Sequence, residues 1–302
     1  MNTDFSDKFL AFNLCNLRNL RIKFLFLCRI DWFDPMEKIM LTNAQIAQFK
    51  RDGFLNGGVV LTEDEVEVLR SETMRVIEER ERTDIPQPVL TRNLARSQDA
   101  PVWQIVNIWQ ASAPFHRLIS HPKITAGLAQ LTNAQELRIW HDQIQYKPPQ
   151  IGGVNMWHQD APLWPIIAPM TEVTAWIALD DVDVENGCMS MVPGSQLWGN
   201  HIDFLNTLKD YTEMPSSFEG HEVKVTPCPV KKGEVHYHHA LTWHGSHANH
   251  SVHHRRAIAL HYMTQDTCYV ASGNHPMKPF VEVADGKKLQ GKAFPKVYPT
   301  VE

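Results

Sequence analysis

The N-terminal half of the chain has the periodicity of amphipathic helices. The segments 42–53 and 62–82 each begin with a threonine that is followed three residues later by Gln or Glu, the spacing of a capping box. Apolar residues then recur every three or four positions, and Gly53 and Pro86 follow as stop signals. A third stretch, roughly 113–131, has the same texture. The pattern predicts three helices ahead of the first long strand.

From residue 137 the texture changes to short runs in which polar and apolar residues alternate, as in strands with one buried face. These runs are Leu137–Lys147, Thr171–Leu179, Glu222–Val225, Val235–His238 and Arg255–Met263. Helices followed by short strands indicate a mostly β domain with flanking helices, so we expect a double-stranded β-helix, the cupin-like jelly roll. The segment 194–220 is long for a loop in a compact domain, and we expect it to be a lid over a substrate site.

The first 35 residues differ from the rest of the chain. Phe9–Ile30 is rich in Leu and Phe, but four basic residues interrupt it, which argues against both a membrane span and a secretory signal. We interpret residues 1–35 as a weakly ordered extension or the result of a misassigned gene start. Residues 36–302 are then expected to form a single domain.

Composition narrows the class of protein without indicating an activity. Apolar residues make up 43% and charged residues 21% of the chain, as in ordinary globular domains. The net charge of −5 is spread without a long block of one sign, so we expect neither nucleic acid nor a membrane as a partner. Five widely spaced cysteines form no C-x-x-C pair, which favours a cytoplasmic protein over a disulfide-bonded secreted one.

Histidine is the unusual component of the sequence. Nine of the 16 histidines fall between His236 and His261, yet the sharpest local signal lies outside that cluster, in Trp157-His-Gln-Asp160. On an extended chain, residues two apart project from the same face, so His158 and Asp160 can bind one ion together. A second histidine would complete the 2-His-1-carboxylate triad of non-haem iron(II) oxygenases. Taken alone, however, the triplet is more often part of a surface loop.

Four motifs in order along the chain give this triplet a context. They are Gln143-Ile-Gln-Tyr-Lys-Pro-Pro-Gln-Ile-Gly-Gly153, the triplet itself, Ala175–Asp180 with Glu185–Ser195, and Thr242-Trp-His-Gly-Ser-His-Ala-Asn249 followed by Arg255-Arg256. With these motifs the chain resembles the phytanoyl-CoA dioxygenase family from about residue 40 to residue 265. The resemblance implies a jelly-roll core, iron(II), 2-oxoglutarate and O₂, and hydroxylation of an unactivated carbon.

Carried over position by position, the resemblance makes His158, Asp160 and His244 the iron ligands. It makes Arg255, eleven residues after His244, the anchor for the distal carboxylate of 2-oxoglutarate. A guanidinium suits this role because it can pair with a carboxylate through two parallel hydrogen bonds. The other co-substrate contacts that the resemblance implies are Ser246, Gln143 and Trp176, with Gln104 and Lys147 as further candidates.

The residues themselves leave two of these assignments open. Alternation along a strand places His236, His238 and His244 on one face, so His236 or His238 is either an alternative ligand or a partner that orients one. Arg256 competes with Arg255 as the co-substrate anchor. Strand parity favours Arg255, because it shares its face with two alanines that suit the wall of a cavity.

The substrate is the least determined part of this interpretation. We expect a small organic molecule, and no basic cluster for the phosphates of coenzyme A is evident. The tryptophans near the motifs suit a core as well as a substrate site; they are Trp103, Trp109, Trp157 and Trp164. The rival functions are a non-catalytic jelly roll that binds a metal or ligand and an iron halogenase, in which a small residue would replace Asp160.

Overall fold

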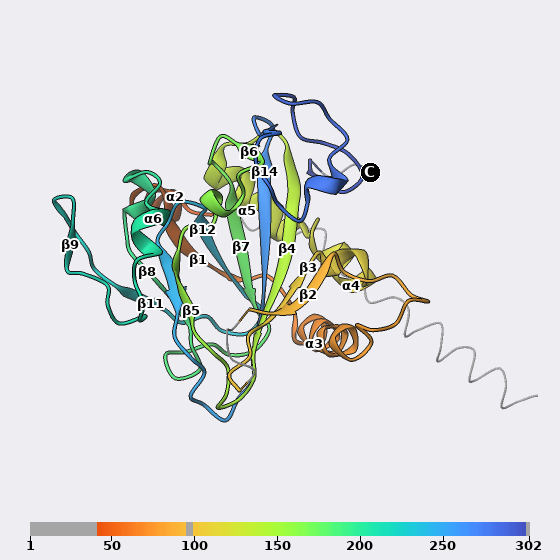
Figure 1. The fold of residues 1–302 in the computed structure, drawn as a ribbon, viewed down its shortest axis with the longest axis horizontal. Coiled ribbons are helices and arrows are strands. Elements are labelled where there is room, and N and C mark those ends of the chain that lie inside the picture. The colour runs from red at the N-terminus through yellow and green to blue at the C-terminus, as the bar shows by residue number, and fades with distance from the viewer. Residues whose placement is uncertain (1–40, 95–98, 300–302) are drawn as a thin grey trace, which may run out of the picture. The chain divides into compact units, whose positions relative to one another are not determined.

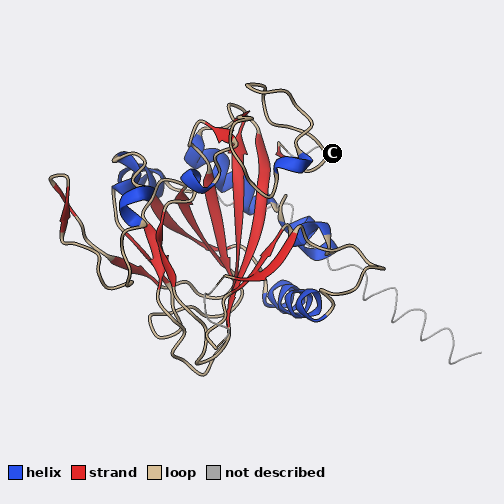
Figure 2. Ribbon diagram, in the orientation of Figure 1, coloured by secondary structure: helices blue, strands red, loops and turns tan. Residues whose placement is uncertain are grey.

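Two antiparallel sheets face each other in the part of the chain that this computed structural model describes, residues 41–94 and 99–299 (Figures 1 and 2). The larger sheet has the strand order β1-β12-β7-β14-β4-β3-β2, with β16 paired to β4, and the smaller has the order β11-β8-β13-β5. This is the predicted jelly roll. The proposed extension, residues 1–35, lies outside the described residues, so its interpretation stays a prediction.

The strands agree with most of the sequence prediction. The larger sheet contains β1 (Phe54–Val59), β2 (Leu90–Asn93), β3 (Trp103–Val106), β4 (Leu137–Lys147), β7 (Val173–Ala178), β12 (Glu234–His239), β14 (Arg255–Thr264) and β16 (Lys296–Tyr298). The smaller sheet contains β5 (Asn155–His158), β8 (Met189–Met191), β11 (Thr226–Cys228) and β13 (His244–Ser246). Two short pairs are formed by β6 (Ile167–Ala168) with β15 (Cys268–Tyr269) and β9 (Ser217–Phe218) with β10 (His221–Glu222).

One predicted strand, Glu222–Val225, is wrong. Its first residue ends the β9–β10 hairpin, and the chain enters the smaller sheet only at β11. Strand β11 contains Pro227, which has no N–H to donate to a neighbouring strand. The strand forms because it lies at the edge of its sheet, where one side needs no hydrogen-bond partner.

The helices begin where the capping boxes predict. Helix α2 (Asn43–Asp52) starts after Thr42 and stops at Gly53, whose φ of 82° suits glycine. Helix α3 (Glu63–Glu78) starts after Thr62 but ends before the predicted Arg82.

The third predicted helix is two helices, α4 (Ala113–Leu118) and α5 (Pro122–Thr132). Pro122 has no N–H to continue α4, but it fits the first turn of α5. The remaining helical pieces are short: α6 (Ile202–Leu205), η1 (Ile108–Gln110), η2 (Ala161–Leu163), η3 (Ser195–Leu197) and η4 (Lys278–Phe280).

The outer face of the larger sheet is apolar and packs against helices. Ile144, Ile258, Ile177 and Val235 lie side by side across four strands, all fully buried. On the same face, the Tyr262 hydroxyl donates to a backbone carbonyl between α4 and α5 over 2.9 Å. Burial of this apolar row stabilises the sheet.

The inner face is polar, and the strand registers arrange its side chains in rows. Along β14 this face carries Arg255, Ala257, Ala259 and His261, and the strands beside it add one or more residues to each row. In order, the rows are Lys147 with Arg255; Gln145, Ala257 and Ala178; Gln143, Ala259, Trp176 and His236; and His141, His261, Thr174 and His238. The first of these rows contains two cations, and the last is rich in histidine. The candidate site lies along these rows.

Candidate iron and co-substrate site

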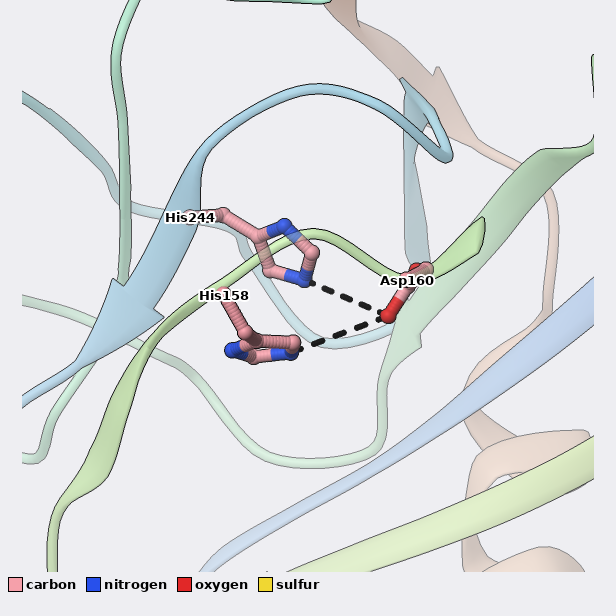
Figure 3. Close-up of side chains that lie close together, drawn as sticks. All are labelled: His158, Asp160 and His244. Carbon is pink, nitrogen blue, oxygen red and sulfur yellow. Dashed lines mark ion pairs between the residues drawn. The ribbon is translucent and has the colours of Figure 1, made fainter. Parts of the chain in front are cut away.

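Three candidate iron ligands converge from the smaller sheet (Figure 3). His158 ends β5, Asp160 follows two residues later, and His244 opens β13 directly opposite His158. The Nε2 atoms of both histidines lie 3.6 Å from Asp160 Oδ1. The three potential ligand atoms all lie within 4.8 Å of one another, so one ion can contact all three.

Backbone contacts fix how the two histidines face this point. His158 Nδ1 lies 2.8 Å from the Met156 carbonyl oxygen, and His244 Nδ1 lies 2.9 Å from the Thr242 carbonyl oxygen. A carbonyl only accepts, so each Nδ1 carries the proton and each Nε2 keeps its lone pair. Burial lowers the pKa of both imidazoles, that of His158 to about 4. A divalent metal binds histidine through an unprotonated ring nitrogen, so two neutral imidazoles with both Nε2 atoms close to the Asp160 carboxylate suit such an ion.

The second oxygen of Asp160 is held from the larger sheet. Asp160 Oδ2 lies 3.3 Å from His238 Nε2 and accepts a hydrogen bond from the Thr174 hydroxyl over 3.2 Å. Thr174 Oγ1 in turn lies 2.8 Å from His261 Nδ1. These contacts leave Oδ1 directed at the two histidines. His238 is therefore placed to orient a ligand, as one of the two predicted alternatives had it.

Sequence analysis missed Thr174 and His261 as parts of the site. Thr174 lies on the same face of its strand as Trp176, and His261 lies on the same face of its strand as Arg255. This pattern indicates a common site only once β7 and β14 are known to be neighbouring strands. His236, the other alternative ligand, lies one row further along the inner face. Its ring stacks on Phe54 with centroids 5.7 Å apart, and it does not reach Asp160 within the described contacts.

Arg255 lies at the far end of the inner face, and no anion of the described residues lies beside it. Its side chain is fully buried, and none of its three guanidinium nitrogens has a hydrogen-bond partner within residues 41–94 and 99–299. Burial lowers its pKa to about 10, which still leaves it charged at neutral pH. The guanidinium carbon lies 4.9 Å from the centre of the Trp176 ring. A buried, unpaired charge is costly, so this geometry suits a cation that receives a carboxylate from a ligand.

Arg256, the alternative anchor, already has its anion. Its Nε and Nη2 atoms donate to the two carboxylate oxygens of Asp180 over 2.9 and 2.8 Å. Arg70 also pairs with Asp180, over 2.9 Å. Arg256 therefore belongs to a structural ion-pair network on the other face of β14.

The other predicted co-substrate residues divide into two groups. Gln143, Trp176 and Ser246 line a narrow inner cavity together with the three candidate ligands. Lys147 lies behind this wall, where its ammonium donates to the Ser246 hydroxyl oxygen over 2.8 Å. Gln104 does not line the inner cavity, but its amide nitrogen donates to the side-chain oxygen of Gln143, which does.

A larger cavity of about 950 Å³ opens onto the same metal point. His158, Asp160 and His261 form its floor, and amides are prominent on its wall: Gln104, Gln143, Gln145, Asn155 and Asn206. Two cations, Arg92 and Lys209, also line it, whereas Asp160 is the single carboxylate among the described lining residues. The volume is in the range of small-molecule sites.

The segment 194–220 contributes to this cavity through Asn206, Leu208 and Lys209. The Tyr211 ring stacks on Trp157 with centroids 5.2 Å apart, and the Trp157 indole donates to the Tyr211 carbonyl over 2.8 Å. This part of the segment therefore contacts the strand that carries His158. Its role as a lid stays a prediction.

The four tryptophans do not form one aromatic wall. Trp164 lines the cavity, whereas Trp157 is buried in the core cluster beneath the segment 194–220. Trp103 and Trp109 are not part of the cavity wall, and Trp109 lines a separate surface groove beside α4.

Together, a jelly roll, a set of two histidines and one carboxylate, and a buried arginine without a partner in the described part of the chain define a class, the non-haem iron(II), 2-oxoglutarate-dependent oxygenases. The family model described as Phytanoyl-CoA dioxygenase (PhyH) matches residues 49–257. The chain belongs to the phytanoyl-CoA dioxygenase family. The predicted enzyme class, a dioxygenase-type oxidoreductase that uses iron and 2-oxoglutarate, is thereby confirmed.

Individual relatives agree with this family. Peroxisomal phytanoyl-CoA dioxygenase of Mus musculus is 25% identical over 276 residues, which cover 83% of this chain and 78% of that protein. The crystal structure of the non-haem α-ketoglutarate-dependent carbocyclase SnoK from nogalamycin biosynthesis has a TM-score of 0.69 and 27% identity, covering 87% of this chain and 99% of SnoK. The epimerase SnoN of the same biosynthesis has a TM-score of 0.66 and 25% identity, covering 84% of this chain and 97% of SnoN.

Membrane insertion through a helix has no support in the described part of the chain. None of the helices there is both long and apolar enough to cross a bilayer.

Proposed function

We propose that this protein hydroxylates an unactivated carbon of a small organic molecule and converts 2-oxoglutarate to succinate and CO₂. In this proposal His158, Asp160 and His244 hold iron(II), and Arg255 anchors the distal carboxylate of 2-oxoglutarate. The observation that carries the proposal is the buried guanidinium of Arg255, which has no partner in the described residues and shares the inner face with the residues behind the triad.

The donor set fits iron(II). Two neutral imidazoles and one carboxylate on one side of an ion leave its other side free for 2-oxoglutarate and O₂. When bound, iron(II) would activate O₂, which is the oxidant: decarboxylation of 2-oxoglutarate would supply two of the four electrons that O₂ takes up, and the substrate C–H bond the other two. An iron halogenase is disfavoured because Asp160 occupies the position that a halide would need. A purely ligand-binding jelly roll is disfavoured because the ligands and the arginine are all in place.

The protein's own residues position and shield the reactants. Arg255 fixes the end of the co-substrate that does not react, while Ala257 and Ala259 present only methyl groups on β14 between Arg255 and His261. His238 and Thr174 hold Asp160 in place. Trp164 and the segment 194–220 form part of the wall that limits access of water to the floor of the cavity.

The cavity wall favours a substrate that carries both polar and apolar groups. Side-chain amides and two cations share the wall with apolar residues such as Met156, Leu163 and Trp164. A long unbranched acyl chain would leave many hydrogen bonds of the amides and cations unmade. This lining supports a hydrogen-bonding metabolite or natural product. It gives no particular support to a coenzyme A thioester.

The experiment that tests this function is a screen of polar small molecules for stimulation of succinate formation by the iron(II)-loaded enzyme under ¹⁸O₂. The proposal expects one compound to stimulate turnover and to leave with one ¹⁸O atom in a new hydroxyl group, and Asp160→Ala to abolish both signals. Stimulated turnover that yields a cyclised or epimerised product without ¹⁸O would contradict hydroxylation while leaving the enzyme class intact.

A further inference from the structure

Lys147 is a second buried cation beside Arg255. It is the last residue of β4 and lies directly opposite Arg255 in the register of β4 and β14. Both side chains are 0% exposed, and neither forms an ion pair with a carboxylate within the described residues. Burial, with a smaller contribution from Arg255, lowers the pKa of Lys147, so an anion at this end of the inner face would stabilise the protonated forms of both side chains.

The ammonium of Lys147 is already fully engaged. Its Nζ donates to the Ser246 hydroxyl oxygen over 2.8 Å, to the Ser246 carbonyl over 3.2 Å and to the His247 carbonyl over 2.6 Å. An ammonium has three N–H donors, so these contacts use all of them. Lys147 therefore has no donor left to offer a ligand, and it acts on the cavity only through its neighbours and its charge.

The backbone around Lys147 holds it in this position. The Asn249 side chain donates to the Lys147 carbonyl over 3.2 Å. Gly152 packs so closely that a Cβ there would lie 2.5 Å from Lys147 Cβ. The lysine is thus fixed on both sides, and its contact with Ser246 is part of a rigid arrangement.

The contact decides what the Ser246 hydroxyl can do. Because Ser246 Oγ accepts from Lys147, its single O–H must be donated elsewhere, and Ser246 lines the inner cavity. A hydroxyl that receives a charged hydrogen bond is also a stronger donor, because hydrogen bonds in a chain polarise one another.

We propose that Lys147 is a positioning residue for the co-substrate. It fixes the Ser246 hydroxyl as a donor to the distal carboxylate, and its charge adds to that of Arg255 in selecting 2-oxo acids that carry a second carboxylate. This inference rests on the proposed function, since it assumes that 2-oxoglutarate occupies the inner cavity. It assigns to Lys147 an indirect role in place of the direct contact expected from sequence.

The test is calorimetric titration of two 2-oxo acids into the anaerobic iron(II) protein. 2-Oxoglutarate has the distal carboxylate, and 2-oxobutyrate lacks it but keeps the end that reaches the metal. Lys147→Met should weaken 2-oxoglutarate binding on the order of 10-fold or more and leave 2-oxobutyrate binding unchanged. Ser246→Ala should weaken 2-oxoglutarate binding in the same selective way, and adding it to Lys147→Met should cost less than about 2-fold more.

A matched control comes from Lys278, whose Nζ likewise donates to two backbone carbonyls, both over 2.7 Å, but these belong to Ala271 and Gly273, which line neither cavity. Lys278→Met should leave the affinities for both acids unchanged. If Lys147→Met fails to fold, Lys147→Gln replaces it, because the amide keeps two donors and loses the charge.

The outcomes separate the inference from the proposed function. If the wild type does not bind 2-oxoglutarate, the proposed function fails and the inference fails with it. If the wild type binds but Lys147→Met has the same affinity, the inference alone is wrong. Equal losses for both acids would mean that Lys147 only supports the fold, which would also overturn the inference.

Discussion

The two faces of β14 each carry a buried or half-buried arginine, but only the arginine on the outer face has a carboxylate partner in the described residues. Arg255 points to the inner face, is buried, and has no partner in the described residues, whereas its neighbour Arg256 points to the outer face and pairs through two hydrogen bonds with Asp180. The outer face satisfies its polar groups and buries an apolar row. The inner face leaves buried polar groups without partners among residues 41–94 and 99–299, at a cost to stability.

This difference indicates where function lies in the sheet. A protein tolerates buried, unpaired charge where a ligand completes the arrangement, and strongly shifted pKa values cluster at such sites. On the inner face burial lowers the pKa of Arg255, Lys147 and His261. Substitutions on the inner face should therefore impair binding and turnover, and those on the outer face should impair stability.

The largest effect is expected from the three candidate ligands. His158→Ala, Asp160→Ala and His244→Ala should each reduce iron-dependent succinate formation below detection while the fold remains, because each removes one of three ligands. Metal content and succinate are measured on the same samples. His236→Ala is the control. Activity retained by His244→Ala but lost by His236→Ala or His238→Ala would show that the third ligand is wrongly assigned.

The comparison between the two arginines gives the next largest effect. Arg255→Ala should raise the KM for 2-oxoglutarate by roughly 10²–10³-fold, the usual cost of removing one partner from a buried charge pair. Arg256→Ala should leave this KM nearly unchanged and lower the melting temperature, because it breaks the ion pair with Asp180. Arg255→Lys should restore binding only in part, since an ammonium lacks the planar fork. A larger KM effect for Arg256→Ala would reverse the assignment.

A smaller effect is expected at Thr174, which donates to Asp160 from the inner face. Thr174→Val keeps the shape of the side chain but removes the hydroxyl, and loss of such a support typically costs about 10–100-fold in metal affinity. Iron(II) affinity is measured by competition with a chelator. Thr171→Val, on an exposed residue outside the inner face, is the matched control. Equal iron affinity in both variants would mean that Thr174 has no part in holding the ligand.

The smallest effect concerns His236 and acid stability. Burial, with smaller contributions from His238 and His244, lowers the pKa of His236 to about 3. The unfolded chain, with an ordinary pKa of about 6.5, binds a proton that the folded protein does not. Stability is therefore complete above about pH 6.5 and falls as the pH decreases toward 3, by about 2 kcal/mol at pH 5.

His236→Phe should remove this loss, because phenylalanine can stack on Phe54 without titrating. Urea unfolding of the metal-free protein at pH 7.5 and pH 5 should show a decrease in unfolding free energy that is about 2 kcal/mol smaller in the variant. Substitution of the exposed His250 should leave the decrease as in the wild type. An identical decrease in His236→Phe and wild type would contradict the pKa assignment.

The sequence was most informative where a signal is local. Capping boxes located α2 and α3, alternation located β4, and the His158 triplet required only two residues on one extended segment. What depends on distant segments could not be predicted. Thr174 and His261 become part of the site only through the pairing of β7 with β14. Arg256 stayed an alternative anchor because its partner Asp180 is 76 residues away in the sequence.

The most direct test of the account is titration of 2-oxoglutarate into the anaerobic iron(II) protein, followed by visible absorption. Chelation of the metal by the 2-oxo acid end gives a charge-transfer band that neither component gives alone. The account predicts a band that saturates at one 2-oxoglutarate per protein in the wild type and is absent from Asp160→Ala. A wild-type protein that binds iron at the triad yet develops no band at millimolar 2-oxoglutarate would contradict it.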